Sequence, residues 1–322
     1  MSAVSAVSGV SAVNAALRRP RALRPGDRVA LLSVSGRIQG ARLRETVDRL
    51  QAEGLEPVVF PSARYDGDAL RYLAGPDEQR ADDLTAALLD DSLRAVFFGR
   101  GGYGAQRALE RLDWSRFAAV EPKPLVGYSD VTAVHEAVGV ALGWASLHGP
   151  LVASNVPPDA ASWASLLSAL MRPEEFTELV FDSSRAAVGG VAAGVTVGGN
   201  LAMLVSSLGT STSRPARGGL LLLEDVEEDD YRVDRMLTQL RRSGYLDGVA
   251  GIISGSWTNC GGEVGVEHVL LDRLADLGVP FLLGADIGHG GRNLTFPLGV
   301  EAVLDADAGR LTFPDPPLLP VS

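Results

Sequence analysis

Short apolar runs alternate with amphipathic segments through the first half of the chain, and this alternation limits the fold more than any other feature. The apolar runs are RVALLSVS, EPVVFP, LRAVFFG and KPLVGYS. Between them, apolar residues recur at helical spacing in segments of roughly ten to fifteen residues. Strands that alternate with such helices predict βαβ units and a parallel sheet. Because the runs lack polar alternation, we expect helices to cover both faces of that sheet.

The pattern changes after residue 150. Residues 151–185 read as a linker that contains one helical segment, DAASWASLLSALM. Farther on, Gly and Val become frequent, and the apolar runs are GGLLLLEDV, VAGIISGSW, VPFLLGAD and GVEAVLDADAGRLTF. Two helical patterns, DDYRVDRMLTQLRRSG and GVEHVLLDRLADLG, lie between these runs.

These two patterns predict an α/β protein of two domains. We expect a Rossmann-like, parallel-sheet N-terminal domain over residues 21–165, a linker over 166–185, and a β-richer α/β C-terminal domain over 186–322. Ligand sites often form where two domains meet, so the active site is expected in the cleft between them.

Residues 1–20 form a low-complexity Ala/Ser/Val segment, which we interpret as a flexible tail. Its arginines, from Arg18 onward, follow the apolar part, whereas a secretory signal carries its positive charge first. The segment is also too short and too rich in serine to span a bilayer. The sequence therefore favours a cytoplasmic protein without a membrane partner.

Charge and cysteine content exclude several classes of function. The formal net charge is −11, from 29 Lys and Arg against 40 Asp and Glu, and no basic stripe is visible, so we expect no nucleic-acid partner. Cys260 is the single cysteine, which excludes an intrachain disulfide and a cysteine-based metal site. A lone cysteine is sometimes a nucleophile, although an inert one is the usual case. The four histidines lack metal-site spacing, and we expect neither a metal nor a cofactor.

The stretch GYSDVTAVHEA places Ser129 between an apolar run and a helical pattern. A serine at this position is typical of a helix N-cap, although Thr132 stands where a capping box needs Glu or Gln. The alternative is a nucleophile on a sharp strand-to-helix turn, although Val131 replaces the second glycine of G-x-S-x-G. Local sequence leaves both interpretations open and favours the cap.

GRGGYG, at residues 99–104, allows three interpretations. It matches the G-x-G-x-x-G dinucleotide fingerprint, but it follows the third apolar run and lacks a well-placed acidic partner. It is otherwise a tight strand-to-helix crossing, or a turn that presents backbone N–H groups to an anion or oxyanion.

Two further residues stand out for their surroundings. Glu224 ends a run of four leucines, where a carboxylate is costly unless it is paired with a group such as His or Arg. His289 lies in the glycine-rich stretch GADIGHGGRNLTFPLG, and loops of this kind often carry function. His148, in SLHGP, is a weaker candidate, and its alternative role is to fix the turn that follows the helix.

Taken together, these pieces resemble the LD-carboxypeptidase family of serine peptidases, which includes the murein tetrapeptide carboxypeptidases and the microcin C immunity proteins. The similarity covers residues from about 25 to 315. It rests on YLAGPDEQRADDL, FFGRGGYGAQRALERLD, KPLVGYSDVTAVHEA, LHGP, GGNLAML, LLLEDVEEDDYRVDRMLTQL and IGHGGRNLTFPLG, which occur in this order.

The resemblance implies a role for each matching residue. Ser129 is the expected nucleophile, His289 the general base and Glu224 the residue that orients His289. The oxyanion hole is expected to use the backbone N–H of Asp130 and one from the turn at Gly101 and Gly102. Tyr103 and Asn200 are further candidates for contacting the substrate.

The implied reaction is hydrolysis of the bond between an L-configured centre and a terminal D-amino acid, such as release of D-Ala from murein tetrapeptide in cell-wall recycling. The immunity branch instead cleaves an amide in a peptidyl-nucleotide. An aromatic side chain that stacks on the adenine would favour that branch, and Trp163 and Trp257 are the candidates, although Trp163 fits a buried helix position equally well. A nucleotide-binding module that uses GRGGYG is the non-catalytic alternative. The family also suggests a homodimer.

Overall fold

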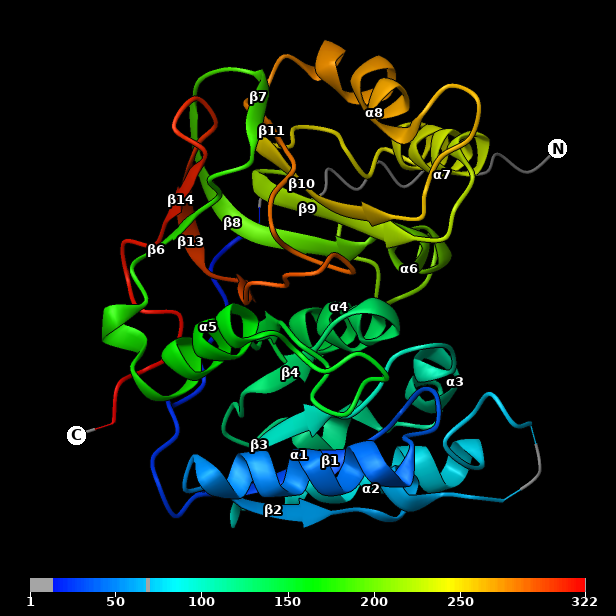
Figure 1. The fold of residues 1–322 in the computed structure, drawn as a ribbon, viewed down its shortest axis with the longest axis vertical. Helices are drawn as coiled ribbons and strands as arrows, with labels where there is room; N and C mark the ends of the chain where they lie inside the picture. Colours follow the sequence, from blue (N-terminus) through cyan, green and yellow to red (C-terminus); the bar gives the residue numbers. More distant parts are fainter. Residues whose placement is uncertain (1–13, 68–69, 322) are drawn as a thin grey trace, which may run out of the picture.

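The computed structural model describes residues 14–67 and 70–321 of the chain. Its elements form two β-sheets with helices packed on them (Figure 1). One sheet comes mainly from the first half of the sequence and the other from the second half. The fold is therefore a mixed α/β fold with a parallel N-terminal sheet, as predicted.

The N-terminal sheet has six strands in the order β12-β5-β4-β3-β1-β2. Neighbours among β1 to β5 run parallel, and β12 closes one edge antiparallel to β5. The strands are β1 (Arg28–Leu32), β2 (Glu56–Val59), β3 (Leu93–Phe98), β4 (Leu125–Gly127), β5 (Ser146–His148) and β12 (Phe296–Leu298).

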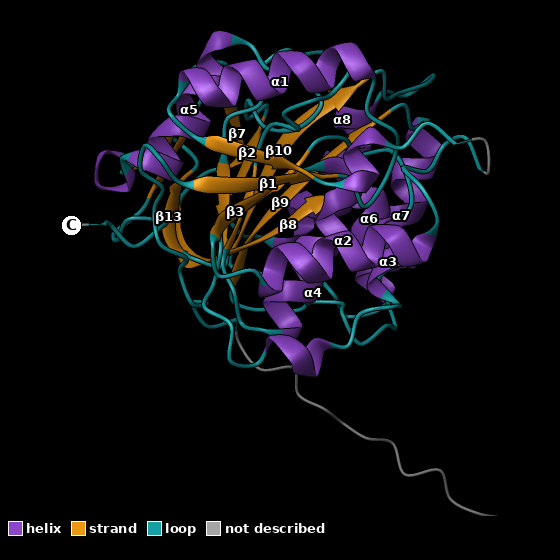
Figure 2. Cartoon of the chain, turned by 90° about the horizontal axis from the view of Figure 1, so that it is seen from below, coloured by secondary structure: helices purple, strands orange, loops and turns teal. Residues whose placement is uncertain are grey.

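Helices cover both faces of this sheet, as the continuous apolar strands predicted (Figure 2). Along β1, Val29 and Leu31 join the core under one pair of helices, whereas Ala30 and Leu32 join the core under the other helices. The first face carries α1 (Gly40–Ala52) and α5 (Ala160–Met171), and the second carries α2 (Asp77–Leu89), α3 (Ala105–Leu109) and α4 (Thr132–Ala141).

The C-terminal sheet has eight strands in the order β6-β14-β13-β8-β9-β10-β11-β7. Its centre, β8 to β11, is parallel, and the flanking strands are antiparallel. The strands are β6 (Glu178–Val180), β7 (Arg185–Val188), β8 (Val191–Asn200), β9 (Gly219–Val226), β10 (Gly251–Thr258), β11 (Phe281–Leu283), β13 (Glu301–Asp305) and β14 (Arg310–Thr312).

Three helices pack on one face of the C-terminal sheet and share a core with it: α6 (Leu201–Ser206), α7 (Asp230–Arg242) and α8 (Val266–Leu274). Helix α4 of the other half lies between the two sheets and contacts β8 and α6 (Figure 1). Short 3-10 turns occur at Pro61–Arg64, Trp114–Phe117, Ser129–Val131, Pro173–Glu175 and Ala275–Leu277.

The sheets do not follow the predicted domain limits strictly. Strand β12 lies late in the chain but completes the N-terminal sheet, and β6 lies inside the expected linker but belongs to the C-terminal sheet. Of the expected tail, residues 1–13 lie outside the described residues, and Arg18 forms a β-bridge with Trp144. The domain limits at residues 21–165, 166–185 and 186–322 stay a prediction.

Candidate active site

Ser129 lies on a sharp turn between β4 and α4. Tyr128 is extended, and Ser129 then takes a φ of 64°, in the left-handed region that a residue with a side chain rarely adopts. Gly101 fits against it closely, since a Cβ at that position would lie 3.0 Å from the Ser129 Cβ and 3.1 Å from its Oγ. Local strain of this kind is held by surrounding structure and is typical of functional sites.

The side chain of Ser129 does not cap a helix. Neither the 3-10 turn Ser129–Val131 nor helix α4 has a hydrogen bond from a capping side chain. The Ser129 Oγ instead lies 3.1 Å from Nε2 of His289, which belongs to a loop more than 150 residues farther along the chain. The capping interpretation, which local sequence favoured, was therefore wrong.

Glu224 and His289 come from the C-terminal half and form the second contact of the site. Nδ1 of His289 lies 2.6 Å from Oε2 of Glu224, which is fully buried near the carboxyl end of β9. Gly288 makes this approach possible, because its φ is 106° and a Cβ there would lie 2.4 Å from the Glu224 carboxylate. The loop is held in place by bonds from Gly288 N–H to Asn293 and from Gly290 N–H to Ser256.

The pKa values of both groups are shifted towards their charged forms. Burial raises the pKa of Glu224, but the imidazoles of His148 and His289 outweigh burial and lower it to about 2. Burial lowers the pKa of His289, but the bond to Glu224 and its charge outweigh burial and raise it above the usual value. The carboxylate therefore favours a proton on the imidazole beside Ser129.

The expected oxyanion donors lie around Ser129. Gly101 and Gly102 follow β3 in the turn that touches Ser129, and between described residues their backbone N–H groups form no hydrogen bond. Asp130 is the second residue of the 3-10 turn Ser129–Val131, and the first N–H groups of a helical turn lack helical partners. Its buried carboxylate accepts a bond of 2.8 Å from Ala105 N–H and so ties the turn to α3.

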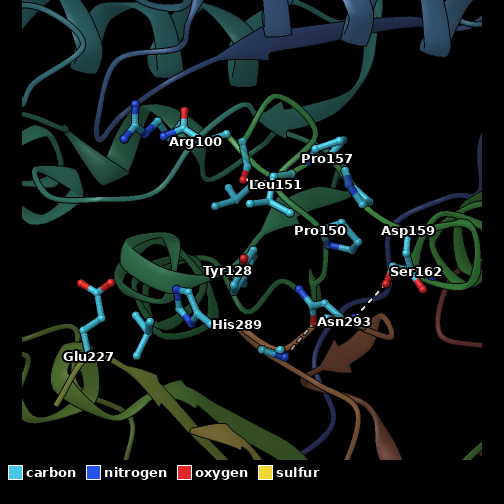
Figure 3. Close-up of a pocket in the computed structure, with 18 residues that line it drawn as sticks. Arg100, Tyr128, Pro150, Leu151, Pro157, Asp159, Ser162, Glu227, His289 and Asn293 are labelled. Carbon is cyan, nitrogen blue, oxygen red and sulfur yellow. Dashed lines mark hydrogen bonds between the residues drawn. The ribbon is translucent and has the colours of Figure 1, made fainter. Parts of the chain in front are cut away.

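A cavity of about 460 Å³ opens beside His289 (Figure 3). Both halves of the chain line it: Arg100, Tyr128 and Leu151 from the first, and Glu227, His289 and Asn293 from the second. The ring of Tyr128 lies 4.7 Å from that of His289, between centroids, so the residue before Ser129 also forms part of the site. The position of Tyr128 directly before Ser129 is the one sequence signal that could have identified it as a site residue.

Tyr103 and Asn200 do not line this cavity. Tyr103 is about half exposed and packs against Tyr72, with 5.9 Å between ring centroids. Asn200 is buried, where its side chain bonds Met203 N–H and Asp225. Their assignment to the substrate stays a prediction.

Trp163, Trp257 and Cys260 also lie outside the cavity lining. The indole of Trp163 donates to Glu53, and that of Trp257 donates to Ser254. Burial raises the pKa of the Cys260 thiol to about 11, which leaves it protonated and a poor nucleophile.

Within the described part of the chain, no group of three or more His, Cys, Asp or Glu side chains is arranged to hold a metal ion. Across the same residues, no helix is both long and apolar enough to span a membrane.

The sequence of this chain matches the models of a known protein family over both halves. Residues 29–149 match the model of the LD-carboxypeptidase N-terminal domain, and residues 193–304 match that of the C-terminal domain. The chain belongs to the LD-carboxypeptidase family. Ser129 lies in the N-terminal match, whereas Glu224 and His289 lie in the C-terminal match.

The similarity of this LD-carboxypeptidase family protein to its relatives covers most of its length. It is 46% identical to a putative carboxypeptidase of Streptomyces coelicolor, over 94% of this chain and 98% of the relative. It is 32% identical to the murein tetrapeptide carboxypeptidase of Pseudomonas aeruginosa, over 88% and 94% of the two chains. A solved structure of the microcin C7 self-immunity protein has the same fold, with a TM-score of 0.84 over 93% of this chain and 99% of that one, at 22% identity.

Proposed function

We propose that this protein is a serine carboxypeptidase that hydrolyses an L-to-D peptide bond, with Ser129 as nucleophile, His289 as general base and Glu224 as the residue that orients His289. The observation that carries the proposal is the chain of contacts from Glu224 through His289 to the Ser129 Oγ, at 2.6 and 3.1 Å. Family membership supports the same reaction class.

In the proposed mechanism, the Ser129 Oγ attacks the carbonyl carbon of the scissile bond while Nε2 of His289 accepts its proton. Glu224 holds the imidazole in the required tautomer and stabilises the imidazolium. Backbone N–H groups of Asp130 and of the Gly101–Gly102 turn stabilise the oxyanion. His289 then protonates the departing amine, and water releases the acyl group from Ser129 by the reverse sequence of steps.

The proposed substrate is a murein tetrapeptide that loses its terminal D-Ala in cell-wall recycling. A relative with 32% identity bears the name murein tetrapeptide carboxypeptidase. The runner-up, hydrolysis of a peptidyl-nucleotide amide, needs an aromatic side chain that stacks on the base. Trp163 and Trp257, the candidates for this role, bond elsewhere and do not line the cavity, which favours the peptide substrate.

The test is mass spectrometry of the protein incubated with tetrapeptide, tripeptide and a peptidyl-adenylate analogue. We expect release of D-Ala from the tetrapeptide, and a loss of about 10⁴-fold or more in kcat for Ser129→Ala with the fold retained. A Ser129→Ala variant that hydrolyses the tetrapeptide at the normal rate would refute the proposal. Cleavage of the adenylate alone would favour the immunity-type reaction.

The non-catalytic alternative is checked separately by calorimetry with NAD and ATP. Micromolar binding without any hydrolysis or acylation of Ser129 would favour a nucleotide-binding module. Size-exclusion chromatography with light scattering tests the expected homodimer, and cell fractionation tests the expected cytoplasmic location; both stay predictions.

A further inference from the structure

A second imidazole lies near the Glu224 carboxylate, at the oxygen that does not contact His289. Both His148 and Glu224 are fully buried, and Nε2 of His148 lies 3.8 Å from Oε1 of Glu224. Among described residues, neither ring nitrogen of His148 has a hydrogen-bond partner, and neither has Oε1 of Glu224. Two unpaired polar groups therefore face each other directly behind the Glu224–His289 contact.

The backbone of His148 is fixed while its ring lies among the site residues. Strand β5 pairs at this residue with Gly127 on one side and Phe296 on the other. The ring of Tyr128 lies 5.7 Å from the His148 ring, between centroids, and also contacts His289. The side chain thus packs beside Tyr128 and Glu224, although it does not line the cavity.

Burial makes the unpaired carboxylate oxygen costly. Leaving a buried charged acceptor without a donor destabilises it, and a bond from a neutral N–H group removes that penalty. Oε2 of Glu224 already contacts His289, so Oε1 needs a different donor. If a small side-chain rotation moves Nε2 of His148 by about 1 Å towards Oε1, the two atoms come within the usual hydrogen-bond range.

We propose that His148 is a positioning residue that donates from Nε2 to Oε1 of Glu224, so that the carboxylate is held between two imidazoles. This role rests on the proposed function of Glu224 and His289. By fixing the carboxylate plane, His148 keeps Oε2 aligned on His289 and so keeps Nε2 of His289 directed at Ser129.

The experiment compares His148→Phe, which removes the donor, with His148→Gln, whose amide N–H can take the place of Nε2. We expect His148→Phe to lower kcat by about ten- to hundredfold with KM unchanged, and His148→Gln to recover most of that loss. The rate at which a fluorophosphonate labels Ser129 is measured in parallel and should fall by a similar factor. His268→Phe, on the exposed face of α8, is the control and should leave both rates unchanged.

A direct readout is the low-field proton NMR signal of the His289 Nδ1–H bonded to Glu224. We expect His148→Phe to shift or broaden this signal while the thermal midpoint shows that the protein is folded. The positioning role is wrong if His148→Phe keeps the normal kcat and signal, or if the glutamine variant loses as much kcat as the phenylalanine variant. Failure of the catalytic proposal itself is distinct, because Ser129 in the wild-type protein would then not label.

Arg100 supports a separate inference about the substrate. Its partly buried side chain lines the cavity on the wall opposite His289 and Glu227 (Figure 3). One guanidinium nitrogen donates to the backbone oxygen of Arg37 at 2.7 Å, and Arg100 forms no ion pair with any described residue. The next residue in the chain, Gly101, is the one that fits against Ser129.

The charges of the cavity leave Arg100 as the favourable position for an anion. Asp159 and Glu227 also line the cavity and repel a carboxylate. A carboxypeptidase substrate necessarily carries a free carboxylate on the residue that is released. Arginine binds such a group through two parallel hydrogen bonds, and an unpaired guanidinium in the cavity is ready to form them.

We infer that Arg100 binds the terminal carboxylate of the residue that is released, again on the basis of the proposed reaction. The test compares a tetrapeptide ending in D-Ala with the same peptide ending in D-alaninamide. Wild-type kcat/KM should favour the free acid by at least about tenfold, and Arg100→Met should remove that preference while Arg100→Lys retains part of it.

The matched control is Arg310→Met, because Arg310 is about half exposed, pairs with Glu178 and does not line the cavity. This variant should keep the preference for the free acid. The inference is overturned if Arg100→Met discriminates between acid and amide as the wild type does, or if the wild type cleaves both equally. Absence of cleavage of either peptide would instead count against the proposed function.

Discussion

At the scale of single residues, the site depends on what each side chain contacts. Ser129 is strained at a φ of 64°, Glu224 is fully buried, and His289 bridges them from a loop. The strained backbone and the buried carboxylate are each unfavourable in isolation. The strain is compatible with function because it presents the Oγ to His289, and the imidazole offsets the cost of burying the carboxylate.

The pH dependence of activity follows from these contacts. His289 accepts a proton only when neutral, and Glu224 raises its pKa above 6.5, so kcat/KM should fall on the acid side with a midpoint above that value. Glu224→Gln removes the negative charge, which should move the midpoint to lower pH and reduce kcat by about 10³- to 10⁴-fold. Rate profiles between about pH 5 and 9 measure both effects. A midpoint that does not move in the variant would contradict this account of the pair.

At the scale of elements, the turn after β3 shapes the space around Ser129. GRGGYG leads into α3 (Ala105–Leu109); Gly101 packs against Ser129, and Gly102 follows it in the same turn. The third interpretation of this motif, a turn that presents N–H groups to an oxyanion, fits the position of the two glycines and stays a proposal. Strand β5 is a second element that positions a residue near the site. It is three residues long and places His148 within 3.8 Å of Glu224.

Gly101→Ala tests this turn. The added methyl group would lie about 3.0 Å from the Ser129 Cβ and 3.2 Å from Leu151, so we expect it to displace the nucleophile and reduce kcat by at least about tenfold. Gly40→Ala, where the nearest atom would be 3.7 Å away on a flexible arginine, is the control and should keep full activity. Steady-state rates and thermal midpoints separate loss of activity from loss of fold. Normal activity in Gly101→Ala would show that the turn tolerates the shift.

At the scale of the whole molecule, the two halves are interdependent. Strand β12 comes from the second half and closes the edge of the first sheet. One hydrophobic core contains Leu147 and Trp163 together with Leu222 and Ile253 of the other sheet. The site likewise takes Ser129 from one half and Glu224 and His289 from the other.

We therefore expect the protein to unfold in one cooperative transition, because the shared core and strand β12 couple the two halves. Far-UV circular dichroism and tryptophan fluorescence should give the same midpoint, since Trp114, Trp144 and Trp163 report on the first half and Trp257 on the second. Fluorophosphonate labelling of Ser129 should be lost at that midpoint as well. Two separate transitions would contradict the shared core.

The sequence by itself determined the parallel sheet and the helices that cover it, because local patterns of apolar residues reflect burial in each element. It also singled out Ser129, Glu224 and His289, but only through several motifs considered together. Locally, the same serine was better explained as a cap. The short strands β5, β6 and β12 and the longer strand β8 were not among the predicted strands, and β8 contains three glycines, a residue type that is depleted in strands.

Only the tertiary structure decided which groups meet. The contacts from Ser129 to His289 and from His289 to Glu224 join residues 160 and 65 positions apart, and no local preference encodes them. The unpaired atoms of His148 and the unpaired charge of Arg100 became visible for the same reason. A missing partner is a property of the surroundings in space, which the folded chain alone creates.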